Sequence, residues 1–325
     1  MNRKVGYAIV LALALAAPLV IYPVFLMKVL CFALFACAFN LLIGYTGLLS
    51  FGHAAFFGGA GYLTGHAVKV WGLPFELGIV VGVITAALIG LVMGLLAIRR
   101  QGIYFTMITL ALAQMVFFVA LQAPFTGGED GLQGVPRGQL LGLVDLHNDT
   151  TLYYVVLAIA VAGFALIVRT VHSPFGQVLK AIKENEPRAI SLGYDVDRFK
   201  LLAFVLSAAL SGLAGATKTI VLGFETLTDV HWSMSGLVVL MTLVGGLGTL
   251  VGPIVGAIVI IVLENKLGEI GNWLARLTHI EWFATLGESV TIVTGFIFIV
   301  CVLAFRRGIV GELLALFQKK KPASA

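Results

Sequence analysis

Charged residues are scarce in this chain of 325 residues, because Asp, Glu, Lys and Arg together make up only 11% of it. An ordinary soluble domain carries about 25%. A transmembrane helix needs about 20 apolar residues to cross roughly 30 Å of hydrocarbon, and several uncharged stretches reach that length. These stretches are 5–27, 77–98, 102–128, 150–168, 201–217, 230–263 and 289–305. The scarcity of charge therefore excludes a soluble globular protein and predicts an integral membrane protein.

Cysteines and catalytic motifs are lacking as well. The three cysteines, Cys31, Cys37 and Cys301, lie in apolar sequence, where thiols behave as small hydrophobic groups, so neither a disulfide framework nor a metal site is predicted. The chain has no Gly-x-Ser-x-Gly or His-Glu-x-x-His motif, and we predict no catalytic residues. It also has no Gly-x-x-x-x-Gly-Lys-Ser/Thr loop, which excludes ATP hydrolysis by that route.

No acidic or basic residue is clearly placed at mid-depth in an expected span. Lys218 is the nearest candidate, but it lies close enough to the expected span end at Leu222 to extend its ammonium group outward. Proton-driven carriers usually need a charge inside the membrane, so this absence disfavours a carrier and leaves a passive channel open.

The distribution of basic residues predicts the orientation. The segment 123–150 holds four acidic residues against Arg137, whereas the segment 169–200 is rich in basic residues: Arg169, Lys180, Lys183, Arg188, Arg198 and Lys200. Cytoplasmic loops carry the excess of Lys and Arg. We therefore expect both termini, Arg99–Arg100 and the 169–200 loop to be cytoplasmic, and 123–150 to be external.

The first run, 5–27, also resembles a cleavable signal peptide, but its length favours a first transmembrane helix. If 5–27 crosses from the cytoplasm to the outside, the segment 29–70 must cross back and then out again. By the same count of crossings, 234–263 must begin and end outside. The latter is too long for one span and too short for two, so we expect a pair of short helices meeting at the Gly-rich residues 245–253. The expected fold is a single all-α membrane domain, residues 1–325, with about 8–10 transmembrane helices including Gly-interrupted or re-entrant segments.

Two readings of the glycines stay open. One Gly-interrupted segment in each half of a chain is typical of a transporter with an inverted repeat and a binding pathway between the repeats. Alternatively, the glycines only allow helices to pack closely, because several pairs have the Gly-x-x-x-Gly spacing. These pairs are Gly61/Gly65, Gly78/Gly82, Gly90/Gly94 and Gly252/Gly256.

Neutral polar residues near these segments are candidates for the substrate pathway. The candidates are Tyr45, Ser50, His53, Thr106, Thr109, Gln114, Gly245 and Gly248. For each there is a structural alternative: a lone histidine here is more often a hydrogen-bonded packing residue, and threonine hydroxyls often bond back to the preceding helical turn.

The 169–200 loop predicts two short helices. Ser173-Pro174 starts the first, and Gly193 ends the second. Such a compact charged loop suits docking to a soluble partner, although an amphipathic segment lying on lipid headgroups is the alternative.

Five segments in order resemble the LivM-type permease subunit of branched-chain amino-acid ABC importers. They are 44–54, 102–111, 127–136, 175–193 and 245–253. The resemblance implies one half of a permease pair, completed by a second homologous permease subunit, two cytoplasmic ATPases that bind ATP–Mg, and a periplasmic binding protein. It implies alternating access in a bacterial inner membrane, no cofactor bound by this chain, and no nucleic-acid partner.

The same resemblance assigns the ATPase-coupling role to Glu184, Glu186, Ala189 and Gly193. The general importer pattern is Glu-Ala-Ala, three residues, then Gly. Here Pro187 and Arg188 follow Glu186, and Gly193 is seven positions on instead of six. This departure leaves the ATPase-contacting residues open.

Other functions are compatible with parts of the sequence. A urea or other amide importer has similar permease subunits. A passive channel or secondary carrier would need no docking loop, and an intramembrane enzyme lacks a visible nucleophile–base pair.

The orientation can be tested by labelling single cysteines in intact cells, on a background without Cys31, Cys37 and Cys301. We expect a cysteine at Lys183 to be protected from an impermeant reagent and one in 123–150 to react, because of the charge asymmetry. Reaction at Lys183 from outside would show that the topology is inverted.

Overall fold

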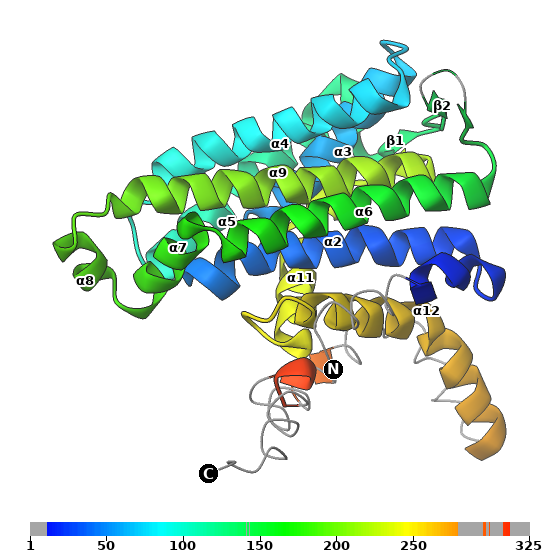
Figure 1. The fold of residues 1–325 in the computed structure, drawn as a ribbon. Coiled ribbons are helices and arrows are strands. Elements are labelled where there is room, and N and C mark those ends of the chain that lie inside the picture. Colours follow the sequence, from blue (N-terminus) through cyan, green and yellow to red (C-terminus); the bar gives the residue numbers. More distant parts are fainter. Residues whose placement is uncertain are drawn as a thin grey trace.

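The computed structural model describes residues 12–278 except 141 and 143, together with 295–296, 299 and 308–312. Its long helices lie side by side in one bundle (Figure 1). The helices are α2 (Pro23–Thr46), α3 (His53–Lys69), α4 (Phe75–Ala97), α5 (Ile103–Gln122), α6 (Asp149–His172), α7 (Pro174–Glu184), α8 (Glu186–Ser191), α9 (Val196–Leu222), α10 (Leu227–Val230), α11 (Trp232–Gly245) and α12 (Gly252–Thr278).

Five of the described helices, α2, α4, α5, α6 and α9, are long and apolar enough to cross a membrane. The expectation of an all-α membrane protein is confirmed. α3, α11 and α12 pack among these five, and they include the expected interrupted segments. The inverted repeat stays a prediction.

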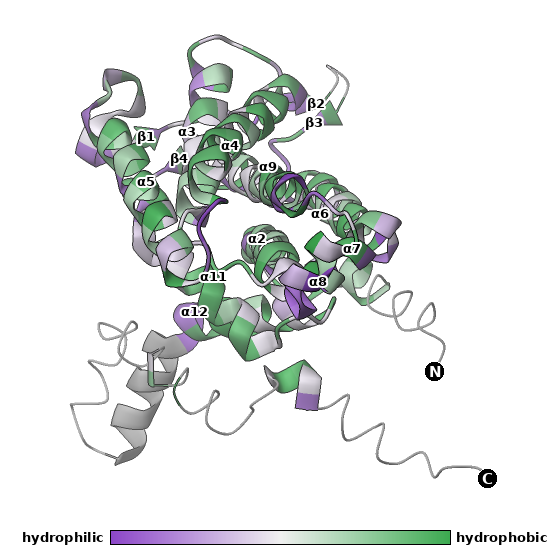
Figure 2. Ribbon diagram, turned by 90° about the vertical axis from the view of Figure 1, so that its left-hand side faces the viewer, coloured by the Kyte–Doolittle hydropathy of each residue, from purple (hydrophilic) through white to green (hydrophobic). Residues whose placement is uncertain are grey.

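α2 forms the centre of the bundle. In α2, 72% of the apolar 18-residue stretch is buried, compared with 22% of the corresponding stretch in α5. Seen along the bundle axis, α2 is surrounded by α9, α6, α7 and α11, while apolar residues also cover the outer helices (Figure 2). α5 therefore presents most of its apolar surface outward, whereas α2 contributes to the main core, in which Phe35 and Phe39 are fully buried.

The expected first span, 5–27, is wrong at its C-terminal end. Residues 12–16 are helical, and a short 3-10 turn, η1 (Ala17–Leu19), follows. Pro23 then begins α2, so the residues from Pro23 to Met27 belong to the next helix. Pro18 and Pro23 explain the break, because proline lacks the N–H that would continue a helix and is well tolerated in its first turn.

The loops expected on opposite sides do lie at opposite ends of the bundle (Figure 1). α7 and α8 form one end. The other end carries the 3-10 turns η2 (Pro124–Thr126) and η3 (Gly128–Asp130) and two antiparallel strand pairs. β1 (Leu132–Gln133) pairs with β4 (Phe224–Glu225), and β2 (Gln139–Leu140) pairs with β3 (Val144–Asp145). Which end is cytoplasmic stays a prediction.

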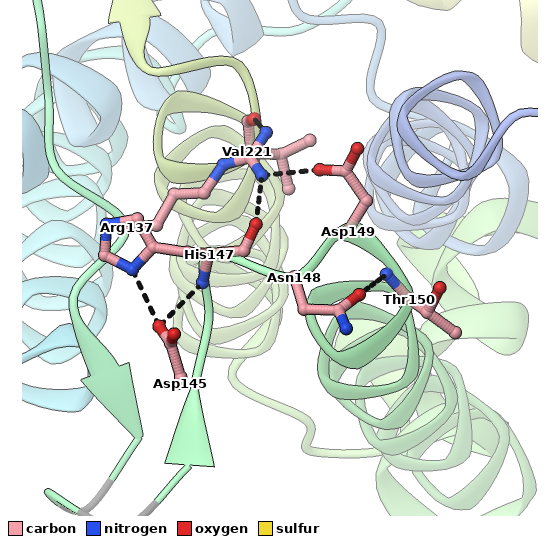
Figure 3. A network of polar contacts seen from close by, with 7 residues as sticks. All are labelled: Arg137, Asp145, His147, Asn148, Asp149, Thr150 and Val221. Carbon is pink, nitrogen blue, oxygen red and sulfur yellow. Dashed lines mark hydrogen bonds and ion pairs between the residues drawn. The ribbon is translucent and has the colours of Figure 1, made fainter.

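Arg137 fastens this second loop to the bundle (Figure 3). Its guanidinium donates to Asp149 Oδ1 at the start of α6 (2.5 Å) and to the carbonyl of Val221 near the end of α9 (3.2 Å). Beside it, hydrogen bonds from the backbone N–H and the ring of His147 hold the pKa of the Asp145 carboxyl below its usual value. The one basic residue of the acidic segment thus joins two helix ends.

In α4 the glycines allow close packing against neighbouring helices, as the Gly-x-x-x-Gly spacing predicted. A Cβ at Gly90 would lie 2.5 Å from Ala208 Cβ, and one at Gly94 would lie 2.6 Å from Leu201 Cδ1, both on α9. A Cβ at Gly82 would lie 3.0 Å from Ala216 Cβ and from the Ala60 carbonyl. Side chains at these positions would separate α4 from α3 and α9.

The segment 234–263 does contain two helices, α11 and α12, joined at 246–251, but α12 is longer than the short helix expected. The expected last span, 289–305, lies largely outside the described residues, as do Cys301 and most of the basic residues at the two termini.

Gly82→Ala should destabilise the protein by roughly 1–3 kcal/mol, because the added methyl group overpacks the α3–α4–α9 contact despite the better helix propensity of alanine. Gly236→Ala in α11 is the matched control, because a Cβ there meets no atom within 4 Å. Thermal unfolding in detergent measures both. Equal or higher stability of Gly82→Ala relative to Gly236→Ala would contradict this account of α4.

Candidate functional site

The first glycine-rich segment leaves its helix inside the bundle. α2 ends at Gly47, which adopts a left-handed conformation (φ +79°), and α3 begins only at His53. Backbone between helices in a membrane protein needs protein partners, because lipid offers none. Thr106 and Thr109 of α5 supply two of them: Thr106 Oγ1 donates to the Leu49 carbonyl (2.9 Å), and Thr109 Oγ1 accepts from the Phe51 N–H (3.2 Å).

Ser235 of α11 holds the same segment from another side. Its hydroxyl donates to the Phe51 carbonyl (2.7 Å) and accepts from the Ala54 N–H (2.8 Å). Ser235 is fully buried, and the sequence interpretation missed it. The segment is thus held by side chains that lie far away in the sequence, and the hydroxyls of α5 do more than bond back to their own helix.

His53 is a buried packing residue with one well-defined hydrogen bond. The Ser207 hydroxyl donates to the Ala38 carbonyl (2.6 Å), so its oxygen is left to accept from His53 Nε2 (2.9 Å). The ring meets Phe39 and Phe56 edge-on. His53 therefore links α3 to α9 and, through Ser207, to α2, in agreement with the structural alternative for this histidine.

The second broken segment, 246–251, is held by Asn40 of α2. Its side-chain amide accepts from the Gly248 N–H (2.9 Å) and donates to the Thr249 carbonyl (2.9 Å). Gly248 has φ +73°, and Gly245 packs against the Gly252 backbone too closely for a side chain. Backbone conformation and close packing therefore explain why glycine occupies both predicted positions. Asn40, which holds the turn, was not among the predicted pathway residues.

The predicted pathway residues form two groups. Ser50, His53, Thr106 and Thr109 lie around the first broken segment, and Gly245 and Gly248 lie at the second. Tyr45 lies in the last turn of α2, next to Gly44, which meets Gly248. Gln114 lies further along α5, beyond both groups. Tyr45, Ser50, His53 and Thr109 are all at least 94% buried in the single chain. Their role in a substrate pathway stays a prediction.

The expectation that Lys218 reaches outward is wrong. Lys218 is 3% exposed, and its ammonium group forms ion pairs with Asp229 and with Glu225 Oε2 (3.3 Å). Thr219 Oγ1 also donates to Glu225 Oε2 (2.5 Å). The acids belong to the chain that folds back after α9, and a Cβ at Gly58, in the first half of α3, would lie 2.8 Å from the Asp229 backbone. A charged cluster therefore lies inside the bundle.

Two further polar atoms belong to this region. Glu225 Oε1 and the Tyr62 hydroxyl are buried without a hydrogen-bond partner among the described residues. The sequence held a signal for this cluster, because Glu225 and Asp229 follow Lys218 within the first residues after the expected span end. No group of three or more His, Cys, Asp or Glu that could hold a metal ion occurs in the described part of the chain.

The 169–200 loop contains the two predicted short helices. Ser173 caps α7 by accepting from the Gly176 N–H (3.3 Å), and Asn185 caps α8 by accepting from the Arg188 N–H (3.1 Å). Gly193 ends the second helix with φ +87°. Ile182, Ala189 and Val196 form a small core of their own, so the apolar residues Ile182 and Ala189 are used inside the protein.

The predicted coupling residues have different surroundings. Glu186 binds Lys200 Nζ (2.7 Å), which is 3% exposed, and so fastens α8 to α9. Ala189 is buried, whereas Glu184 is exposed. Beyond the predicted set, the tip of the loop exposes apolar side chains at Ile190 (57%), Leu192 (68%) and Tyr194 (42%).

Residues 23–306 match the family model described as "Branched-chain amino acid transport system / permease component". The chain belongs to this family. The permease is 27% identical over 257 residues to the high-affinity branched-chain amino acid transport system permease protein LivM of Escherichia coli (strain K12). That match covers 72% of this chain and 60% of the relative, so the match spans less than two thirds of the curated relative's length.

Relatives with other named substrates also match the permease. It is 30% identical over 194 residues to the autoinducer 2 import system permease protein LsrC of Klebsiella pneumoniae, covering 56% of this chain and 52% of that one. It is 30% identical over 173 residues to the ribose import permease protein RbsC of Bacillus subtilis (strain 168), covering 49% and 51%. The relatives of this chain thus include permeases that are named for chemically different cargo.

Lys218→Met should destabilise the permease by about 3–5 kcal/mol, because it leaves two buried carboxylates without their cation. Adding Glu225→Gln and Asp229→Asn should recover part of this loss. Lys69→Met is the control, since Lys69 makes an exposed hydrogen bond to the Gln133 carbonyl (2.7 Å). Denaturant unfolding in detergent gives the free energies, and equal stability of the two single variants would exclude a structural role for the cluster.

Proposed function

We propose that this chain is a transmembrane permease subunit of an ATP-binding-cassette importer that moves branched-chain, hydrophobic amino acids inward by alternating access. Membership of the permease family supports the transporter class. The LivM relatives of Escherichia coli and Salmonella typhimurium, at 27% and 26% identity, support the substrate class.

The observation that carries the proposal is the tip of the 169–200 loop. Its base is fixed by the Glu186–Lys200 ion pair and by the core around Ile182, while Leu192 and Tyr194 are exposed. Exposed apolar side chains on a rigid, charged support suit a protein interface, where buried apolar and aromatic anchors provide most of the binding energy. The sequence has no phosphate-binding loop, so ATP–Mg would bind on two separate ATPase subunits that dock here.

The remaining parts of the proposed importer follow from this assignment. A second homologous permease subunit would complete the pathway, and a periplasmic binding protein would deliver the substrate at the end that carries the 123–150 loop. The assembly would lie in a bacterial inner membrane with both termini of this chain in the cytoplasm, as the distribution of basic residues favours. This chain would contribute no covalent chemistry.

A urea or amide importer is the alternative within the same class, and the LsrC and RbsC relatives add polar cargo to the possibilities. A secondary carrier is a different class, and the cluster around Lys218 supplies the buried charge that such a carrier needs. In the permease this charge is already paired by Glu225 and Asp229, and the family match favours the ABC assignment.

The proposal is tested by reconstituting the whole complex in liposomes, with candidate ATPase, second permease and binding-protein subunits from the same organism. We expect uptake of leucine, isoleucine or valine that requires both ATP and the binding protein. Uptake of urea or ribose in place of these amino acids would overturn the substrate class. Uptake by this chain alone, without ATP, would overturn the ABC assignment.

The docking surface makes a separate prediction. Leu192→Glu should lower the retention of the ATPase roughly tenfold, because it places an unpaired charge in an apolar contact. Val144→Glu, at an exposed apolar residue at the other end of the bundle (40% exposed), is the matched control. Affinity purification through a tag on this chain measures the ATPase retained. Similar retention in both variants would remove the loop tip from the interface.

A further inference from the structure

The C-terminal end of α2 lies between two segments that are far apart in the sequence. On one side is α7 of the 169–200 loop, whose Lys183 Nζ donates to the Gly44 carbonyl (2.7 Å). On the other side is the 246–251 turn, which Asn40 holds through Gly248 and Thr249. The loop that we assign to ATPase docking and the broken segment thus meet at one helix end.

The contact with Lys183 is a helix cap supplied by a distant residue. The Gly44 carbonyl belongs to the last turn of α2, where carbonyl groups have no partner within the helix. A cation is favourable at this end of the helix dipole. The stem of Lys183 also follows the helix end, because its Cγ would lie 3.3 Å from a Cβ at Gly47. Lys183 therefore binds the end of α2 with both its charge and its aliphatic part.

The contact with Asn40 is bidentate and buried. Asn40 lies one helical turn before Gly44, and residues at this spacing share a helix face. Its amide is both a donor and an acceptor, so it satisfies the Gly248 N–H and the Thr249 carbonyl together. Gly44 itself permits the approach, because a Cβ there would lie 3.0 Å from the Gly248 nitrogen. The turn cannot slide along α2 unless both bonds to Asn40 break.

The units on the two sides of this helix end are stiff. In the turn, Thr249 Oγ1 donates to the Gly246 carbonyl (2.8 Å) and accepts from the Gly252 N–H (3.0 Å). In the loop, α7 is capped by Ser173, and its Leu179 and Ile182 side chains are buried. The contacts at α2 therefore decide whether the loop and the turn move together.

We propose that Lys183 and Asn40 are positioning residues that link the 169–200 loop to the 246–251 turn through the end of α2. A displacement of α7 by a docked ATPase pulls on the Gly44 carbonyl, and the Asn40 amide transfers the displacement to the turn. This inference rests on the proposed function. It identifies the contacts through which a conformational change of the ATPase reaches the membrane helices.

The first test compares uptake per ATP hydrolysed in the whole reconstituted complex. Lys183→Met should lower this ratio roughly tenfold, a usual size for coupling between sites, while assembly and basal hydrolysis persist, because Lys183 is exposed and outside the core. Lys183→Arg should restore the ratio, because a guanidinium also donates to a carbonyl. Lys180→Met is the matched control: Lys180 lies on the same helix, 5.8 Å from the Tyr45 ring centre, and its loss leaves the Gly44 bond in place.

The second test is a double-mutant cycle with Asn40→Ser, which is too short to reach both turn groups. If the two residues act in one link, Lys183→Met and Asn40→Ser together should lower the ratio no further than the stronger single change. Multiplying effects would show two independent contributions and overturn the link. The amount of assembled, monodisperse complex is measured for each variant, so that loss of folding is recognised as such.

The third test reads the movement directly. Spin labels at Ala181→Cys and Leu247→Cys, in a chain without its native cysteines, report the distance between loop and turn. Both sites are exposed. With the native Lys183, this distance should stay the same between nucleotide-free and ATP-bound complexes, and with Lys183→Met it should change. A distance that changes equally in both would overturn the inference.

These outcomes separate the inference from the function on which it rests. Normal uptake per ATP in Lys183→Met contradicts the link alone. A native complex without ATP-driven uptake contradicts the proposed function, and the inference is rejected with it.

Discussion

Two segments of irregular backbone at the C-terminal end of α2, 47–52 and 246–251, need hydrogen-bond partners from the rest of the protein. Lipid cannot hydrogen-bond their amide and carbonyl groups, so the protein must. The partners are neutral polar side chains on neighbouring helices: Thr106 and Thr109 for the first segment, and Asn40 for the second. Both segments adjoin α2, which explains why the helix at the centre of the bundle carries polar groups near its end.

Close packing is the second condition for this arrangement. Short side chains such as Ser235 and Ser207 reach the backbone of a neighbouring segment only where helices approach closely. Elsewhere in the bundle, the glycines of α4 allow the same close approach to α3 and α9. The same closeness excludes water from the cluster around Lys218, where the charges must neutralise one another. Close helix packing and buried polar contacts therefore depend on each other in this bundle.

The 169–200 loop lies at the same end of α2, where Lys183 binds the Gly44 carbonyl, and it shows how such a bundle can present a rigid surface to a partner. Glu186 is bound to Lys200, and Ala189 is buried, so these two residues build the support for the exposed tip at Leu192 and Tyr194. This explains how a loop that departs from the general Glu-Ala-Ala spacing can still form a short helix with a defined end. Gly193 provides that end through its left-handed conformation.

The sequence by itself determined the all-α membrane class, most helix positions, the two breaks and the helices of the 169–200 loop. These features depend on local quantities: apolar length, proline, glycine and capping residues such as Ser173. It placed the end of the first helix wrongly, because the apolar run continues through Pro18 and Pro23 without a change in hydropathy.

Only the tertiary structure decided which residues satisfy the broken segments and where the charges lie. Asn40 and Gly248 are 208 positions apart, and Phe51 and Ser235 are 184 apart, so no spacing rule relates them. Lys218 looks free to extend outward until the chain after α9 folds back and places Glu225 and Asp229 beside it. A polar side chain in a membrane helix has many possible partners in sequence, and packing selects the one that is within hydrogen-bonding distance.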